Sequence, residues 1–299
     1  MLLFFGAVVF WLTVFISFLF FSPSKDRVNL LFLGEAGSNH DGASLTDTII
    51  FSSIAADGSV LISIPRDIWL DSGKSKINSL YSTGGFPKIE SAMEDILGQK
   101  IDGSILIDFS LFERIIDQVG GVRVNVEAAF DDYYYPLPGK ENDPCSGDPT
   151  FACRFEHLHF EAGWQTMDGQ TALKFARSRH AEGDEGTDYA RSRRQQMIIA
   201  ALKNQVFSWK FLAQPVRVLE LARMIKNDLK NDLSKETLLS VVKIMLWPKA
   251  RTFSTYVLDG WEKAEGYLYH PAKHSSGLWV LLPQGNNWLG VHQFVESIL

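Results

Sequence analysis

Cysteine is scarce in this 299-residue chain, and positive charge is not in excess. There are two cysteines, and 29 lysines and arginines face 35 aspartates and glutamates, which leaves a net charge of −6 at pH 7. This negative balance argues against nucleic acid as the main partner. The chain also has no internal repeat and no long low-complexity segment. Its 46% of hydrophobic and 21% of charged residues suffice to bury a core, in one large domain or two smaller ones.

Charge is wholly absent from the first 21 residues, which are almost entirely apolar. A bilayer-spanning helix needs about 20 apolar residues, and no small-residue cleavage pattern precedes Ser22. We therefore expect an uncleaved transmembrane anchor at residues 1–21, a short linker at 22–27 and a folded domain at 28–299. Lys25 and Arg27 follow the apolar run, and by the positive-inside rule they favour a cytoplasmic domain.

The two cysteines favour the opposite orientation. Cys145 and Cys153 flank a loop rich in Gly, Pro and Asp, and such a pair is typical of a disulfide outside the cytosol. Free thiols are one alternative. The other is a zinc site that recruits His157 and His159, although Cys-x7-Cys-x3-His-x-His is not a standard zinc spacing.

Hydrophobic patterning predicts an α/β or mixed α+β domain, with a central sheet flanked by helices. The expected strands are 28–33, 49–56, 60–64, 101–109, 122–126, 155–160, 253–258 and 278–282, and the expected helices are 87–97, 111–119, 169–176, 197–207, 216–229, 235–245 and 291–299. Residues 130–153 are aromatic, acidic and proline-rich, which predicts an exposed excursion. The apolar residues of the later helices favour plain core over a pocket for a lipid chain.

Positive charge is concentrated in one place. Five arginines fall within 18 residues: Arg177, Arg179, Arg191, Arg193 and Arg194. Because arginine matches phosphate in two-point contact, the cluster predicts a phosphate or pyrophosphate site. The alternative is an ordinary helical surface, whose arginines pair locally with Asp184, Glu185 and Asp188.

Helical geometry sorts these side chains. Arg177 and Arg179 converge only if a helix ends beside them and the chain becomes extended. Arg191, Arg194 and Gln195 are three and four apart and should share a helix face, whereas Arg193 should point elsewhere into solvent.

Two further polar residues stand at the ends of expected strands. Asp47 precedes the second strand and Arg66 follows the third. The ends of buried strands are where α/β proteins usually place chemistry. The alternatives are a capping role for Asp47 and, beside Arg66, an ion pair with Asp67.

Taken together, several short motifs resemble the LytR-CpsA-Psr family of membrane-anchored cell-envelope proteins. Their order and spacing hold over about residues 28 to 210. The motifs are Thr46-Asp47-Thr48, Ile64-Pro65-Arg66-Asp67, Lys76-Ile77-Asn78, Gly84-Gly85, Gly120-Gly121-Val122, Asp168-Gly169, Ala172-Leu173, Ala176-Arg177-Ser178-Arg179 and Arg191-x-x-Arg194-Gln195-Gln196.

The resemblance implies a mixed sheet covered by helices, with a hydrophobic pocket for a polyprenyl chain. It implies arginines and an aspartate-bound Mg²⁺ at the pocket mouth. The implied reaction moves a glycopolymer from a polyprenyl-diphosphate carrier onto peptidoglycan, outside the cell membrane. The alternatives are a protein that binds polyprenyl phosphates without turnover and a hydrolase that acts on the same lipid diphosphate.

The resemblance also assigns roles to individual residues. Asp47 matches the metal-linked or basic aspartate, and together with Arg66, Arg177 and Arg179 it forms the expected catalytic set. Arg66, Arg177, Arg179 and Arg191 match pyrophosphate-binding arginines, and Lys76 and Gln195 match supporting polar positions.

Two positions depart from the family pattern. The family commonly has an aspartate where this chain has Glu35, and an arginine where it has Leu45. Glu35 and Asp41 join Asp47 as expected metal ligands, and His40 and Asp41 are candidates to compensate for Leu45.

Overall fold

The computed structural model describes residue 13 and residues 25–37, 44–258 and 266–299. The expected anchor at 1–21, apart from Thr13, and the loop residues His40 and Asp41 lie outside these ranges. Within the described part of the chain, no helix is both long and apolar enough to cross a membrane.

A six-stranded mixed sheet forms the centre of the molecule, in the order β11-β6-β1-β2-β3-β12. Its strands are β1 (Arg27–Glu35), β2 (Thr46–Ala55), β3 (Ser59–Ile64), β6 (Gly103–Asp108), β11 (Lys230–Asn231) and β12 (Phe253–Val257). The pairs β1–β2 and β2–β3 are antiparallel, whereas β1–β6 and β3–β12 are parallel. The predicted mixed sheet is confirmed.

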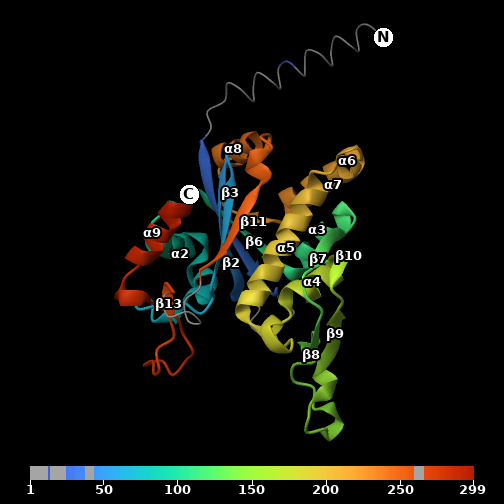
Figure 1. The fold of residues 1–299 in the computed structure, drawn as a ribbon, viewed down its shortest axis with the longest axis vertical. Helices are drawn as coiled ribbons and strands as arrows, with labels where there is room; N and C mark the ends of the chain where they lie inside the picture. Colours follow the sequence, from blue (N-terminus) through green and yellow to red (C-terminus); the bar gives the residue numbers. More distant parts are fainter. Residues whose placement is uncertain (1–12, 14–24, 38–43, 259–265) are drawn as a thin grey trace.

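Helices cover both faces of this sheet (Figure 1). Helices α2 (Leu80–Leu97) and α9 (Leu289–Ile298) pack on one face, where Leu31, Phe51 and Ile62 are fully buried. Helix α8 (Lys235–Met245) packs on the other face, against Leu30 and Ile54. Because both faces are covered, the strands read as continuous apolar runs.

A second core lies beside the sheet. It joins α3 (Phe109–Val119), α4 (Gly169–Arg177), α5 (Asp188–Val206) and α7 (Pro215–Asp228) with the ribbon of β7 (Val122–Val126) and β10 (Gly163–Met167). The strands β8 (Phe130–Pro136) and β9 (Phe155–Phe160) pair and extend from this core as a two-stranded arm (Figure 1). The short elements are β4 (Trp69–Leu70), β5 (Ser75–Lys76), α6 (Trp209–Leu212), β13 (Leu268–Tyr269) and β14 (Leu282–Pro283).

The local signals for helix ends were accurate. The Asp168 side chain accepts a hydrogen bond from the Thr171 N–H at the start of α4, as the predicted cap requires. Gly120 ends α3 with a φ of +90°, a conformation that favours glycine.

Two predicted elements differ from the structure. The exposed excursion predicted at 130–153 is confirmed only for residues 137–153, because residues 130–136 form β8, where Phe130, Asp132 and Tyr135 are buried against the second core. Tertiary packing, which local composition does not encode, buries one side of this arm. The strand expected at 278–282 is reduced to β14, which begins only at Leu282.

Candidate functional site

Asp47 and Arg66 meet at one edge of the sheet. Because β2 and β3 are antiparallel with Ile49 opposite Ile64, Asp47, two residues before Ile49, lies near Arg66, two residues after Ile64. Arg66 Nη1 donates to Asp47 Oδ1 at 2.6 Å, and Arg66 Nε lies 3.6 Å from Asp67 Oδ2. Lys76 Nζ donates to the other Asp67 oxygen at 2.5 Å. The four side chains therefore form a row of alternating charge.

This row lies beside a pocket of about 770 Å³, a volume that includes its open mouth. The pocket is lined by Asp47, Thr48, Ile49, Ser63, Ile64, Pro65, Arg66, Asp67, Asp188, Tyr189, Arg191, Ser192, Gln195, Val257, Leu258, Trp279 and Leu281. Charged groups thus share the pocket with aliphatic side chains from the ends of β2, β3 and β12. Such a lining fits a ligand with an anionic head and an apolar tail.

The first turns of α5 supply the opposite wall. Arg191 and Gln195 are four residues apart and share the predicted helix face. Arg191 Nη1 lies 2.8 Å from Asp188 Oδ1, and Gln195 Nε2 donates to Thr48 Oγ1 at 3.1 Å. Burial lowers the pKa of Arg191 to about 10, so the guanidinium stays charged at neutral pH.

The pKa of Arg66 moves the other way. Burial acts to lower it, but Asp47, by its charge and its hydrogen bond, together with Asp67, raises the pKa of Arg66 above its ordinary value. Arg66 and Arg191 are therefore both permanent cations at the pocket. The Asp47 side chain remains 43% exposed despite its bond to Arg66.

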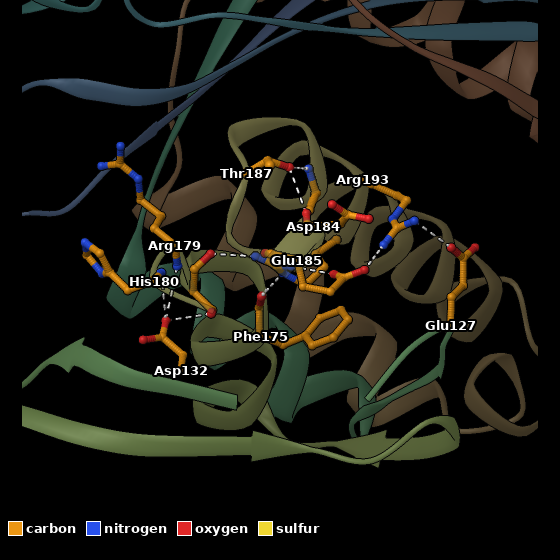
Figure 2. A network of polar contacts seen from close by, with 12 residues as sticks. Glu127, Asp132, Phe175, Arg179, His180, Asp184, Glu185, Thr187 and Arg193 are labelled. Carbon is orange, nitrogen blue, oxygen red and sulfur yellow. Dashed lines mark hydrogen bonds and ion pairs between the residues drawn. The ribbon is translucent and has the colours of Figure 1, made fainter. Parts of the chain in front are cut away.

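Arg179 reaches the same acidic group from a different segment. Its Nε lies 3.6 Å from Asp188 Oδ1, the oxygen that also pairs with Arg191. The backbone of Arg179 is held from below by Asp132 of the β8–β9 arm (Figure 2). Asp132 Oδ2 accepts from Ser178 Oγ at 2.7 Å and from the backbone N–H groups of Arg179 and His180 at 3.2 Å each.

Arg194 has a structural role rather than the predicted place on the Arg191 face. It is 1% exposed and donates to the carbonyl oxygens of Phe175 at 3.0 Å and Ser178 at 2.6 Å. It also pairs with Glu185 at 2.8 Å. Helix α5 turns Arg194 toward the end of α4, where it satisfies carbonyl groups that the helix leaves without partners.

The sequence predicted that Arg193 points into solvent, but the structure gives it two acidic partners. Its guanidinium pairs with Glu127 at 3.0 Å and with Glu185 (Figure 2). The predictions for Arg193 and Arg194 failed for the same reason. Both arginines pair with Glu185, which lies in the 183–186 turn next to α5.

Arg177 and Arg179 do not converge. The chain does become extended after Arg177, but Arg177 turns into a second cavity and stacks on Phe109 at 4.0 Å. Arg177 Nη1 donates to Tyr135 Oη at 3.1 Å. Pyrophosphate binding by Arg177 remains a prediction. Arg177 lines a different cavity from Arg66 and Arg191.

Glu35 lies opposite Thr46, the residue before Asp47, but its side chain pairs elsewhere. It is buried at the end of β1 and accepts from Lys230 Nζ at 3.2 Å, beside Asp108 of β6. Its expected role as a metal ligand remains a prediction, as does that of Asp41, which lies outside the described residues. In the described ranges, no three metal-ligating side chains gather around Asp47.

The structure thus brings together Asp47, Arg66, Lys76, Arg179, Arg191 and Gln195 of the predicted residues. Sequence reasoning missed Asp188, which it treated only as a local partner of the arginines, and Asp132. The spacing of Asp188 and Arg191 at i and i+3 was an available signal. No such local signal pointed to Asp132, because its hydrogen-bond partners are 46 to 48 residues away in the sequence. Cys145 and Cys153 form a disulfide, the pairing that their spacing favoured.

These features define a class of protein: a mixed α/β fold whose sheet edge and first turns of α5 form a pocket lined by two arginines, three aspartates and aliphatic side chains. Comparison with known proteins supplies the family. The sequence profile of the LytR_cpsA_psr family matches residues 17–276. The chain belongs to the LytR_cpsA_psr family.

Relatives and solved structures agree with this. The chain is 29% identical over 225 residues to "Polyisoprenyl-teichoic acid--peptidoglycan teichoic acid transferase TagU" of Oceanobacillus iheyensis, covering 72% of this chain and 61% of that protein. It is 27% identical to TagV of Bacillus subtilis, covering 66% of this chain and 48% of TagV. The chain thus spans about half to three-fifths of the length of these curated relatives.

A third relative has a different kind of name. "Regulatory protein MsrR" of Staphylococcus aureus is 28% identical over 213 residues, which cover 68% of this chain and 57% of that protein. The crystal structure of B. subtilis TagV has the same fold, with a TM-score of 0.64, 22% identity and coverage of 92% of this chain and 98% of that one. A structure of TagT bound to LIIa-WTA gives a TM-score of 0.60 at 20% identity, covering 93% and 92%.

Proposed function

We propose that this protein transfers a glycopolymer from a polyprenyl-diphosphate carrier onto peptidoglycan. The names of the TagU and TagV relatives support the substrate class. The observation that carries the proposal is the pocket in which Arg66 and Arg191 lie with the Asp47 and Asp188 carboxylates and with aliphatic side chains, while Arg179 reaches Asp188 from outside the lining.

In the proposed reaction, a sugar hydroxyl of peptidoglycan attacks the phosphorus that carries the glycopolymer. A new P–O bond forms to the hydroxyl oxygen, the P–O bond of the diphosphate bridge breaks, and polyprenyl phosphate leaves. Asp47 accepts the hydroxyl proton, because its carboxylate is exposed at the pocket while Glu35 is buried against Lys230. Arg66 and Arg191 hold the diphosphate and stabilise the charge that develops on the leaving phosphate.

A Mg²⁺ cofactor fits this donor set and is part of the proposal. The lining holds Asp47, Asp67 and Asp188 against Arg66 and Arg191, so it has no surplus of positive charge for a diphosphate. Mg²⁺ typically uses one or two carboxylates together with substrate phosphates. Asp47 would hold the ion, which would neutralise part of the diphosphate charge.

We also propose that residues 1–21 anchor the protein in the cell membrane with the folded domain outside the cytoplasm. The apolar sequence supports the anchor, and the Cys145–Cys153 disulfide supports an oxidising compartment.

One observation favours a second function, binding without turnover. Each site arginine is already paired with a carboxylate, and Leu45 provides no further cation. A protein of this kind would hold the lipid diphosphate as a regulatory ligand.

The test uses the full-length chain in detergent with a polyprenyl-diphosphate glycan, with and without Mg²⁺ and peptidoglycan fragments. Release of polyprenyl phosphate and attachment of glycan to the fragments are measured together. Asp47→Asn is expected to lower transfer by at least about 10²-fold, because general-base catalysis contributes about 10² to 10⁴. Asp57→Asn, in the turn at the other end of β2 and β3, is the matched control.

The outcomes separate the candidates. Glycan attached to fragments supports transfer, and release to water without fragments supports hydrolysis. Tight binding with no product in any condition supports the binding protein. Full transfer by the Asp47→Asn variant would refute the proposed role of Asp47.

A further inference from the structure

Large apolar side chains are exposed in one region of the molecule. Nine of the seventeen large hydrophobic residues that are exposed in the described ranges lie between residues 209 and 247, on α6, α7 and α8 or directly after α8. Trp209 is 83% exposed, Val216 68% and Trp247 61%. We call this region the α6–α8 surface. Exposed apolar side chains that gather at one end of a protein often mark a surface that contacts a partner or a membrane.

Helix α8 shows the pattern most clearly, because it has two apolar faces. Ile244 faces inward, where it is buried against the sheet. Leu238, Val242 and Leu246 are spaced four residues apart, so they form a second stripe that faces outward and is exposed. Packing within this chain buries the inward stripe but leaves the outward stripe without an apolar partner in the described residues.

The position of the α6–α8 surface indicates what covers it. The backbone N–H of Lys25, four residues beyond the apolar run 1–21, donates to Ser240 Oγ of α8 at 3.0 Å. The chain therefore enters the fold directly beside α8. Figure 1 shows α6 and α8 at the end of the molecule where β1 begins, away from the β8–β9 arm.

The segment before α6 contacts the segment after α8. The Arg251 guanidinium, shortly after α8, stacks on Phe207 at 4.3 Å, just before α6. Lys203 also donates to the Arg251 carbonyl at 2.5 Å. The exposed Trp209 and Trp247 thus extend from neighbouring segments.

We infer that the α6–α8 surface lies in the interface of a lipid bilayer. Tryptophan combines an apolar ring with one N–H donor, which suits the boundary between acyl chains and headgroups. Lys210 and Lys249 flank the two tryptophans in sequence, and such side chains can reach anionic headgroups while their stems stay apolar. The inference rests on the proposed anchoring by residues 1–21, which places this end of the fold at the membrane.

The test measures contact with lipid directly. The full-length chain is reconstituted in phosphatidylglycerol and phosphatidylethanolamine vesicles with or without brominated acyl chains, which quench nearby tryptophans. Trp247→Phe and Trp209→Phe should each lower the quenched fraction of the tryptophan fluorescence, because each removes a quenched ring. Trp164→Phe, at a similarly exposed ring on β10, should raise that fraction slightly.

Equal behaviour of the three variants would overturn the inference. A second copy of the chain is the competing occupant. In that case light scattering in detergent shows a dimer, Leu246→Glu converts it to a monomer, and quenching at Trp247 is absent. Circular dichroism of the Leu246→Glu variant checks that the fold is retained.

The readout needs no substrate, so it is independent of the proposed transfer. If the surface also admits the carrier, Leu246→Glu should slow uptake of geranylgeranyl diphosphate from vesicles several-fold while its affinity in detergent is unchanged. Absence of binding by the wild type in detergent would refute the proposed function and leave the quenching result to decide the membrane contact.

Discussion

Asp132 offers a prediction that connects the β8–β9 arm to the candidate pocket beside Asp47 and Arg66. It is fully buried, and its Oδ2 accepts three hydrogen bonds from residues 178–180, which hold Arg179 (Figure 2). Its Oδ1 accepts a fourth, from the Tyr134 N–H at 3.0 Å. The perturbation is Asp132→Asn, which keeps the shape and removes the charge and one acceptor.

The structure sets the size of the effect. An asparagine has one acceptor oxygen, so in either orientation its NH₂ group faces at least one N–H donor. A hydrogen bond to a charged group is worth about 1.5–3 kcal/mol. At roughly 2 °C per kcal/mol for a chain of this size, the melting temperature should fall by about 3–6 °C.

Binding should change as well, because Arg179 loses its fixed backbone. We expect the Kd for geranylgeranyl diphosphate to rise about tenfold, which corresponds to about 1.4 kcal/mol. The assay is isothermal titration of the full-length chain in detergent at constant salt. Asp131→Asn is the matched control, since Asp131 is the preceding residue on the same strand and pairs with His157 and His159 outside the pocket.

A double-mutant cycle tests the mechanism. If Asp132 acts through Arg179, Asp132→Asn should change affinity by less than about twofold in an Arg179→Met background, because the side chain that Asp132 positions is already absent. Equal losses of affinity in both backgrounds would refute this reasoning, because they would show that Asp132 affects the pocket only through general stability.

Three further predictions concern single contacts. Arg194→Met should destabilise the fold by about 3–5 kcal/mol, measured by urea unfolding, because it leaves the carbonyl oxygens of Phe175 and Ser178 without their donor and removes one of the two arginines that pair with Glu185; a loss below 1 kcal/mol would contradict a structural role. Arg177→Met should weaken diphosphate binding less than Arg191→Met, since Arg177 lies in the second cavity; an equal loss would favour the role implied by family resemblance. Hydrogen bonds from Asp131 and Glu161 raise the pKa of His159, so its stabilisation of the arm is complete below pH 6.5 and is lost as pH rises through the raised pKa; Asp131→Asn should lower that pKa in an NMR titration.

Much of the fold could be predicted from the sequence because the signals are local. Apolar runs placed β1, β2 and β3, and capping residues placed the ends of α3 and α4. The strand expected at 278–282 failed because an apolar run alone does not establish pairing with another strand.

The candidate site was predicted in part. Asp47 and Arg66 followed from strand ends, and Arg191 and Gln195 from helical spacing. Arg177 and Arg194 could not be sorted in the same way. Their neighbours Tyr135 and Glu185 are brought to them by the arm and by the turn over α5, and residue spacing does not reveal either contact.

The sequence by itself determined the element types, the family and the pool of charged residues, because periodicity, capping and motif order are written along the chain. Tertiary structure decided which charges act together. It placed Arg66 and Arg191 in one pocket, brought Arg179 to the Asp188 carboxylate of that pocket, and buried Arg194. It also used Asp132 to hold the backbone of Arg179. The physical reason is that a charge takes its role from the partners and solvent around it, and those are fixed only when distant segments pack.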